Sequence, residues 1–161
     1  ENMLQIITTN GTHPEDIELE ITERLLVTDQ ARVTDKLKRL DEHGVKLCID
    51  DFGTGYSSLA YLKHYPIDTL KIDRIFVRDV IEDSADAELA AGIIKLAHGL
   101  SMRVTGEGVE TVEQLKFLRG HGCDQVQGYY FSKPLPAAEF AVWINHFNQT
   151  ASATRSASEP T

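Results

Sequence analysis

Five short apolar runs alternate along this chain with segments of helical spacing, and this alternation restricts the fold more than any other feature. The runs expected to form strands are 17–21, 45–50, 69–73, 102–106 and 125–129. Apolar residues at helical spacing, with capping residues, predict helices over about 28–43, 59–64, 76–81, 84–100, 111–120 and 136–147. Strands that alternate with helices favour a parallel sheet with helices packed outside it. The expected fold class is therefore α/β.

Each of these strand-like runs has a charged or amide-bearing residue at its carboxyl end or within about two residues of it. Parallel strands bring their carboxyl ends to one edge of the sheet, where active sites of such folds are found. One polar residue at a strand end is unremarkable, but such residues at five successive ends indicate a functional site. They are Glu20, Asp50 with Asp51, Lys71, Glu107 and Gln127.

The second run leads directly into two adjacent carboxylates, Asp50 and Asp51, and then into a stretch rich in glycine and hydroxyl residues, 52–58. Adjacent carboxylates repel each other, and a hard cation is the usual means of keeping both ionised. A turn with an N-capping Asp is the alternative interpretation of this segment alone. The acidic ends of the other runs favour a metal site.

Composition excludes several classes of function. The chain has 161 residues, enough for one domain, and its net charge of −9 argues against binding a nucleic acid polymer or an anionic membrane. It does not exclude a phosphate-bearing ligand held through divalent ions. No run reaches membrane-spanning length, and the two cysteines, Cys48 and Cys123, lack metal-ligand spacing. We expect a reducing, cytoplasmic setting, although a longer parent protein could be anchored through upstream segments.

Nucleotide-binding signatures of other classes are missing from the sequence. It contains neither a Rossmann nor a P-loop glycine pattern. The Asp51-Phe52-Gly53 triplet occurs in protein kinases, but the glycine-rich and catalytic-loop motifs of a kinase are absent. A kinase is therefore rejected.

Several longer motifs, in their order along the chain, resemble the EAL-domain phosphodiesterases. The motifs are Glu18-Leu19-Glu20-Ile21-Thr22-Glu23, Asp50-Asp51-Phe52-Gly53-Thr54-Gly55-Tyr56-Ser57-Ser58-Leu59, Leu70-Lys71-Ile72-Asp73, Glu107-Gly108-Val109-Glu110-Thr111, Gln127-Gly128-Tyr129 and Phe131-Ser132-Lys133-Pro134-Leu135-Pro136. The resemblance covers about 14–147. It implies a modified TIM-type (β/α) barrel that hydrolyses cyclic di-GMP to linear pGpG with two Mg²⁺ or Mn²⁺ ions.

The resemblance also implies a metal ligand set. Glu20 and Asp50 would bind the first ion, and Asp50 would bridge to a second ion that is also held by Asp51 and Glu107. The residue types fit this chemistry independently, because carboxylate oxygens suit Mg²⁺ or Mn²⁺ better than Zn²⁺. Two such ions can activate a water and neutralise a phosphodiester.

Other residues take roles through the same resemblance. Lys71 would contact the attacking water, and Gln127 would lie beside the metal cluster; with Glu107 and Glu110 they form the expected catalytic group. Glu23 would steady the loop that follows Asp51, and Asp73 has a supporting role. Lys71 could instead form an ordinary surface ion pair, but its place among carboxylates favours the functional role.

Part of the family pattern has no counterpart in this sequence. The Glu-Ala-Leu motif and an Asn ligand of the first metal are absent, and five strands are too few for an eight-stranded barrel of about 250 residues. We therefore expect 1–148 to be the C-terminal portion of an EAL domain lacking roughly three strands, inactive or nearly so alone. A disordered tail is expected over 149–161. Gly106 stands where the family commonly has alanine, a change expected to be tolerated.

Three functions remain open at this point. The leading one is a metal-dependent cyclic di-GMP phosphodiesterase, favoured because the ligand positions present are intact. A catalytically silent cyclic di-GMP receptor is the alternative, and a purely structural interaction domain ranks last. Expected partners are cyclic di-GMP, a second copy through the 52–58 loop, and an upstream sensor or GGDEF-type domain.

Overall fold

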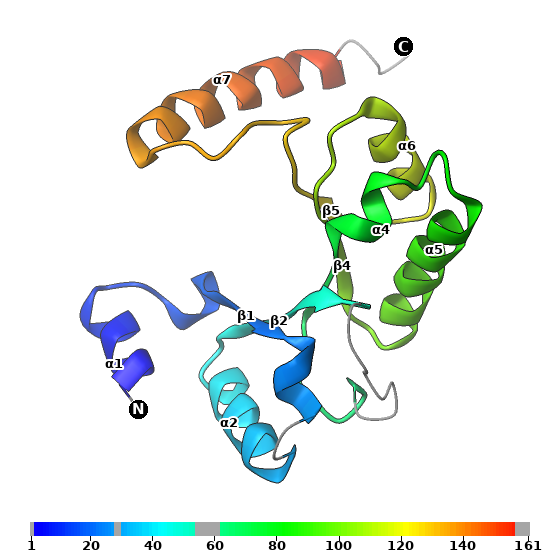
Figure 1. The fold of residues 1–161 in the computed structure, drawn as a ribbon. Coiled ribbons are helices and arrows are strands. Elements are labelled where there is room, and N and C mark those ends of the chain that lie inside the picture. Colours follow the sequence, from blue (N-terminus) through cyan, green and yellow to red (C-terminus); the bar gives the residue numbers. More distant parts are fainter. Residues whose placement is uncertain (1, 28–29, 54–61, 157–161) are drawn as a thin grey trace. The chain divides into compact units, whose positions relative to one another are not determined.

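The computed structural model describes residues 2–27, 30–53 and 62–156 of the chain. It divides into two compact units, Glu1–Phe131 and Ser132–Thr161, which are described separately. The first unit is built on one parallel sheet with its strands in chain order, β1-β2-β3-β4-β5 (Figure 1). The parallel α/β architecture expected from the alternation of strands and helices is therefore confirmed.

The elements of this unit follow the predicted order with shifted ends. The strands are β1 (Glu18–Thr22), β2 (Lys46–Phe52), β3 (Thr69–Ile72), β4 (Arg103–Gly106) and β5 (Gln125–Val126). The helices are α1 (Asn2–Thr9), α2 (Gln30–Glu42), α4 (Arg74–Arg78), α5 (Ser84–Gly99) and α6 (Val112–Gly120), with 3₁₀ turns η1 (Pro14–Asp16) and η2 (Glu23–Val27). The helix expected over 59–64 lies largely outside the described residues.

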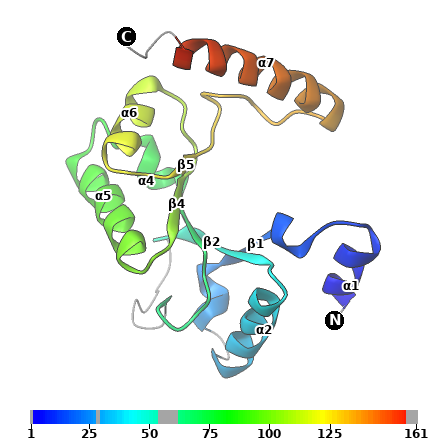
Figure 2. The same ribbon diagram turned by 180° about the vertical axis from the view of Figure 1, so that it is seen from behind.

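The two faces of the sheet differ in character. One face carries fully buried aliphatic residues such as Ile49, Leu70 and Val104. Helices α2, α5 and α6 lie along the strands (Figure 2) and contribute Leu37, Ile94 and Leu118, among others, to this core. The other face is polar, because side chains alternate along a strand. It presents Glu18, Glu20, Asp50, Thr69, Lys71 and Thr105.

Local capping explains several helix boundaries. Thr111 and Gln114 form the capping box expected at the start of α6, each bonding the other's backbone N–H. Asp83 caps α5 and accepts a hydrogen bond from the N–H of Ala85. The helix begins at Ser84, so the residue before it takes the capping position.

The second unit contains α7 (Ala137–Ser156). Phe140, Trp143 and Phe147 stack along it, with neighbouring ring centroids 5.9 and 5.1 Å apart. The sequence predicted a disordered tail from residue 149, whereas the helix continues to Ser156. Alanine and arginine sustain a helix, and neither glycine nor proline interrupts the chain before Pro160.

None of the helices that the structure describes is both long enough and apolar enough to cross a bilayer. The dimer contact expected through 52–58 falls mostly on residues 54–58, which lie outside the described residues.

Candidate metal centre

A bulge in β2 places two adjacent carboxylates at the polar edge of the sheet. Ile49 pairs with Leu70 and Phe52 pairs with Ile72, so Asp50 and Asp51 together lie opposite the single residue between those partners. Asp51 has a positive φ of 54°, in the left-handed region that Asp tolerates better than most residues. Strand β2 continues through both aspartates, and the bulge allows both carboxylates to face one centre.

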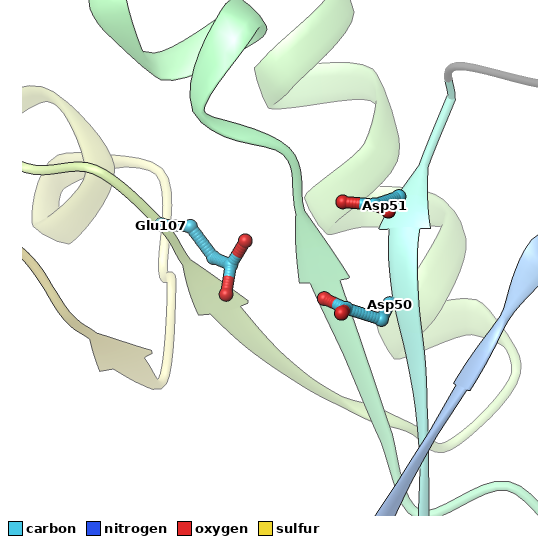
Figure 3. Close-up of side chains that lie close together, drawn as sticks. All are labelled: Asp50, Asp51 and Glu107. Carbon is cyan, nitrogen blue, oxygen red and sulfur yellow. The ribbon is translucent and has the colours of Figure 1, made fainter.

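A third carboxylate comes from the turn that follows β4. One oxygen from each of Asp50, Asp51 and Glu107 lies within 4.8 Å of the other two. Figure 3 shows both aspartates projecting from β2 toward Glu107. These are residues of the described chain that can share a divalent ion.

Lys71 lies among these acidic groups on the neighbouring strand, β3. Its Nζ atom is 2.6 Å from Glu107 Oε1, 2.8 Å from Glu20 Oε1 and 3.0 Å from Asp50 Oδ1. Burial lowers the pKa of Lys71, but its close contacts with the three carboxylates outweigh burial and raise the pKa overall. Lys71 is therefore held protonated and acts as a hydrogen-bond donor.

Glu107 is fixed from a second side by Gln127, whose Nε2 donates a hydrogen bond to Glu107 Oε1 over 2.7 Å. Burial raises the pKa of Glu107 above its ordinary value, and hydrogen bonding to Lys71 only partly opposes this effect. A cation at this position would stabilise the ionised form of Glu107.

Asp73 connects the centre to α4. Its side chain caps that helix by accepting a hydrogen bond from the N–H of Ile75 over 2.8 Å. Its carboxyl also lies beside Asp51, and this contact raises the pKa of Asp51 above its ordinary value. A bound cation would oppose that rise by stabilising the ionised form of Asp51.

Glu23 is the first residue of η2, directly after β1, and contacts the beginning of the loop after β2. It is 3% exposed, and its Oε2 accepts a hydrogen bond from the N–H of Gly53 over 3.1 Å. This contact is of the kind expected of a residue that steadies the loop beginning at Phe52.

Two predicted site residues lie outside the three-carboxylate group. Glu20 contacts Lys71 but is half exposed, at 53% of its side chain. Glu110 is exposed, and its N–H donates a hydrogen bond to Gln114 Oε1 at the start of α6. The structure therefore brings together Asp50, Asp51, Lys71, Glu107 and Gln127, with Glu20 at the margin, and places Glu110 at the capping box of α6.

The donors present fit a hard divalent cation. Asp50 Oδ1 is buried and, among the described residues, has no hydrogen-bond partner; Lys71 is 3.0 Å away but outside hydrogen-bond geometry. A buried carboxylate oxygen without a hydrogen bond is costly, and a metal ion would offset that cost. Three carboxylates without a thiolate or imidazole are a donor set for Mg²⁺ or Mn²⁺.

Comparison with known proteins identifies the family. The model of the EAL domain matches residues 1–134. The chain belongs to the EAL domain family. The resemblance seen in the motifs is thereby confirmed, and with it the fold class: EAL enzymes of known structure superpose on the five-stranded parallel α/β arrangement.

Curated relatives of this EAL chain include enzymes of cyclic di-GMP turnover. It is 49% identical over 131 residues to the cyclic di-GMP phosphodiesterase NbdA of Pseudomonas aeruginosa, covering 81% of this chain and 17% of that protein. It is 36% identical over 135 residues to the cyclic di-GMP phosphodiesterase PdeR of Escherichia coli, covering 84% of this chain and 20% of that protein. The chain thus spans about a fifth of the length of these relatives.

Solved EAL structures agree with this relationship. The PaMucR phosphodiesterase, a cyclic di-GMP complex, has a TM-score of 0.80 at 40% identity and covers 83% of this chain and 54% of that one. A manganese and cyclic di-GMP complex of Klebsiella pneumoniae BlrP1 has a TM-score of 0.76 at 33% identity, with 82% and 34% covered.

The sequence analysis gave no role to Gly128, which directly follows Gln127. Gly128 was quoted there only as part of a family motif. A glycine immediately after Gln127, a predicted site residue, was the available signal, since glycine often marks a close approach of two backbones.

Proposed function

We propose that the intact EAL domain to which these residues belong hydrolyses cyclic di-GMP to linear pGpG. The observation that carries this proposal is the convergence of Asp50, Asp51 and Glu107, with Lys71 at hydrogen-bonding distance from Glu107. The curated names of two relatives describe the same reaction class. An attached sensor or GGDEF-type domain belongs to this proposal as well, since the related MucR of Pseudomonas aeruginosa is named a bifunctional diguanylate cyclase and phosphodiesterase.

The residues divide the work of phosphodiester hydrolysis. Asp50, Asp51 and Glu107 would hold the second Mg²⁺ or Mn²⁺ ion, and Glu20 would join Asp50 at the first ion. Bound ions of this kind neutralise phosphate charge and lower the pKa of a coordinated water. Lys71, kept protonated by its carboxylate neighbours, donates a hydrogen bond toward the water or the developing negative charge.

Supporting residues hold this arrangement in place. Gln127 fixes one oxygen of Glu107, and Asp73 joins Asp51 to the first turn of α4. Glu23 anchors Gly53, and so the beginning of the loop whose further residues we propose to mediate homodimer contacts. Glu110 is proposed to act from the end of the turn that carries Glu107.

The test is cyclic di-GMP hydrolysis by the intact domain with Mg²⁺ or Mn²⁺. Asp50→Ala is expected to abolish release of pGpG, because Asp50 is shared by the ligand sets and contacts Lys71. Asp35→Ala, an exposed aspartate on α2, is the matched control and should leave turnover unchanged. Tight binding of cyclic di-GMP without turnover, despite added metal, would instead assign the domain to the receptor class.

A further inference from the structure

The loops that follow β4 and β5 are joined backbone to backbone beyond the end of the sheet. Gln127 donates its N–H to the carbonyl of Gly106, and the N–H of Val109 donates to the carbonyl of Gln127, over 2.9 and 3.1 Å. Tyr130 then donates its N–H to the carbonyl of Val109 over 2.9 Å. Val109 is fully buried. We call these contacts of Val109 with Gln127 and Tyr130 the loop clasp.

Gly128 lies at the point of closest approach in the loop clasp. A Cβ atom added there would be 2.7 Å from the carbonyl carbon of Val109, and closer still to the nitrogen and oxygen of the same residue. Real Cβ atoms do not approach backbone atoms this closely. The obstacle is main chain rather than a mobile side chain, so a rotamer change cannot relieve it. Only glycine fits while the clasp is closed.

The loop clasp carries two side chains of the candidate metal centre. Glu107 lies two residues before Val109, and Gln127 lies directly before Gly128. Their side chains meet at 2.7 Å, on the Glu107 oxygen that also contacts Lys71. Gln127 is itself exposed, so the position of its amide depends on where the backbone places it.

We propose that Gly128 is a positioning residue: by allowing the two loops to close on each other, it holds Gln127 against Glu107 and thereby orients a carboxylate that binds metal. This inference rests on the proposed function, which supplies the bound metal. The loop clasp itself is defined by the backbone hydrogen bonds alone. Groups that hydrogen-bond a metal ligand from outside typically change metal affinity by about 10–100-fold when they are lost.

The test measures Mn²⁺ affinity of the intact domain by calorimetric titration, with amide hydrogen exchange and thermal unfolding of the same samples. Gly128→Ala is expected to weaken Mn²⁺ binding by about 10-fold or more and to speed exchange at Val109 and Tyr130. Gly120→Ala is the matched control, because no atom lies within 4 Å of a Cβ at that position. Gly120→Ala should leave Mn²⁺ affinity and amide exchange unchanged.

A double-mutant cycle separates positioning from a general loss of stability. If Gly128 acts through Gln127, adding Gln127→Ala to Gly128→Ala costs little further Mn²⁺ affinity, whereas independent effects would add. The inference would be overturned if the losses of Mn²⁺ affinity in the two single variants added in the double variant. It would also be overturned if Gly128→Ala kept the Mn²⁺ affinity and the amide exchange rates of the wild type.

A measurement on the wild-type domain covers the case in which Gly128→Ala does not fold. Saturating Mn²⁺ should slow exchange at Val109 and Tyr130, because metal binding and clasp closure stabilise each other reciprocally. If exchange at Val109 and Tyr130 does not change when Mn²⁺ binds, the inference about Gly128 is contradicted but the proposed function is not. Failure of the wild-type domain to bind Mn²⁺ contradicts the proposed function as well, so the two failures are distinguishable.

Discussion

At the scale of single residues, Lys71 is the cation around which the acidic side chains are arranged. It is 6% exposed and contacts carboxylates from three different strand ends, Glu20, Asp50 and Glu107. Without a metal ion it is the counter-ion that allows these groups to lie close together. With metal present its positive charge competes for the same oxygens, so it should stabilise the metal-free fold while opposing metal affinity.

Lys71→Met tests this dual role. The variant should lose hydrolysis yet bind Mn²⁺ at least as tightly as the wild type, since one competing charge is gone. Its metal-free form should be destabilised by roughly 3 kcal/mol, at the low end for breaking a buried ion pair because Glu20 is half exposed. Urea unfolding with and without Mn²⁺ measures this, and Mn²⁺ should restore most of the loss.

The control for that prediction is Lys46→Met. Lys46 pairs with Asp68 over 3.0 Å but is 44% exposed, so its loss should destabilise the fold much less than the loss of Lys71. Equal destabilisation by the two substitutions, or weaker Mn²⁺ binding by Lys71→Met, would contradict the role given to Lys71.

Much of the residue pattern was accessible from sequence, because parallel strands deliver their terminal residues to one edge. Asp50, Lys71, Glu107 and Gln127 were expected there on that ground. The contact between Asp51 and Asp73 was not, since it depends on where α4 begins after β3. The functional roles of all the site residues, Glu20 and Glu110 included, stay predictions.

At the scale of elements, the packing of β4 against α6 depends on a residue without a side chain. A Cβ on Gly106 would lie 2.6 Å from Cδ1 of Leu118, which is fully buried. The alanine common at this position in the family therefore requires this leucine, or the helix that carries it, to move. Because Glu107 follows Gly106, any such movement begins next to the metal centre.

Gly106→Ala is accordingly expected to destabilise the fold by about 1–3 kcal/mol through overpacking. Combining it with Leu118→Val should cost less than the sum of the single changes, because the shortened side chain frees the space that the new methyl needs. Chemical unfolding of the single and double variants measures this coupling.

Gly99→Ala serves as the comparison, since a Cβ there meets no atom within 4 Å. It should be neutral or slightly stabilising near the end of α5. Full additivity of Gly106→Ala with Leu118→Val would show that Leu118 does not oppose the new methyl.

Element boundaries were harder to predict than element order. The fifth strand was expected to reach residue 129 but ends at Val126, because the chain then turns onto the loop clasp. The β2 bulge has no local sequence signal, since a bulge is a property of two strands paired together. The predicted final helix ended at about residue 147, because the apolar periodicity fades beyond that point. The residues that follow still favour a helix, and α7 continues to Ser156.

At the scale of the whole molecule, the sheet is open within the described residues. Strand β1 pairs only with β2 on one side, which leaves its other edge unpaired there. Unpaired edges promote association with further strands. The chain covers 54% of the PaMucR phosphodiesterase structure, and its sequence contains no Glu-Ala-Leu motif.

The 161-residue chain alone should therefore bind Mn²⁺ through Asp50, Asp51 and Glu107 but release little pGpG compared with the intact domain. The physical reason is that a two-metal reaction needs both ions, and the family resemblance implies that this chain would lack two ligands of the first ion. Parallel assays at equal protein concentration, with Mn²⁺ binding measured on the same preparations, decide this. Full turnover by the 161-residue chain would refute it.

The β2 bulge also affects how the sequence of such a domain can change in evolution. Asp50 and Asp51 are neighbours in the sequence, so adjacent codons encode them. Deleting either codon would leave one residue opposite Lys71 and restore an even ladder between Ile49 and Phe52, whose pairings are already in place. One small in-frame deletion would thus remove a ligand while preserving the packed core. If Asp50 and Asp51 bind metal as proposed, the loss of a single codon would be enough to remove a metal ligand from this fold.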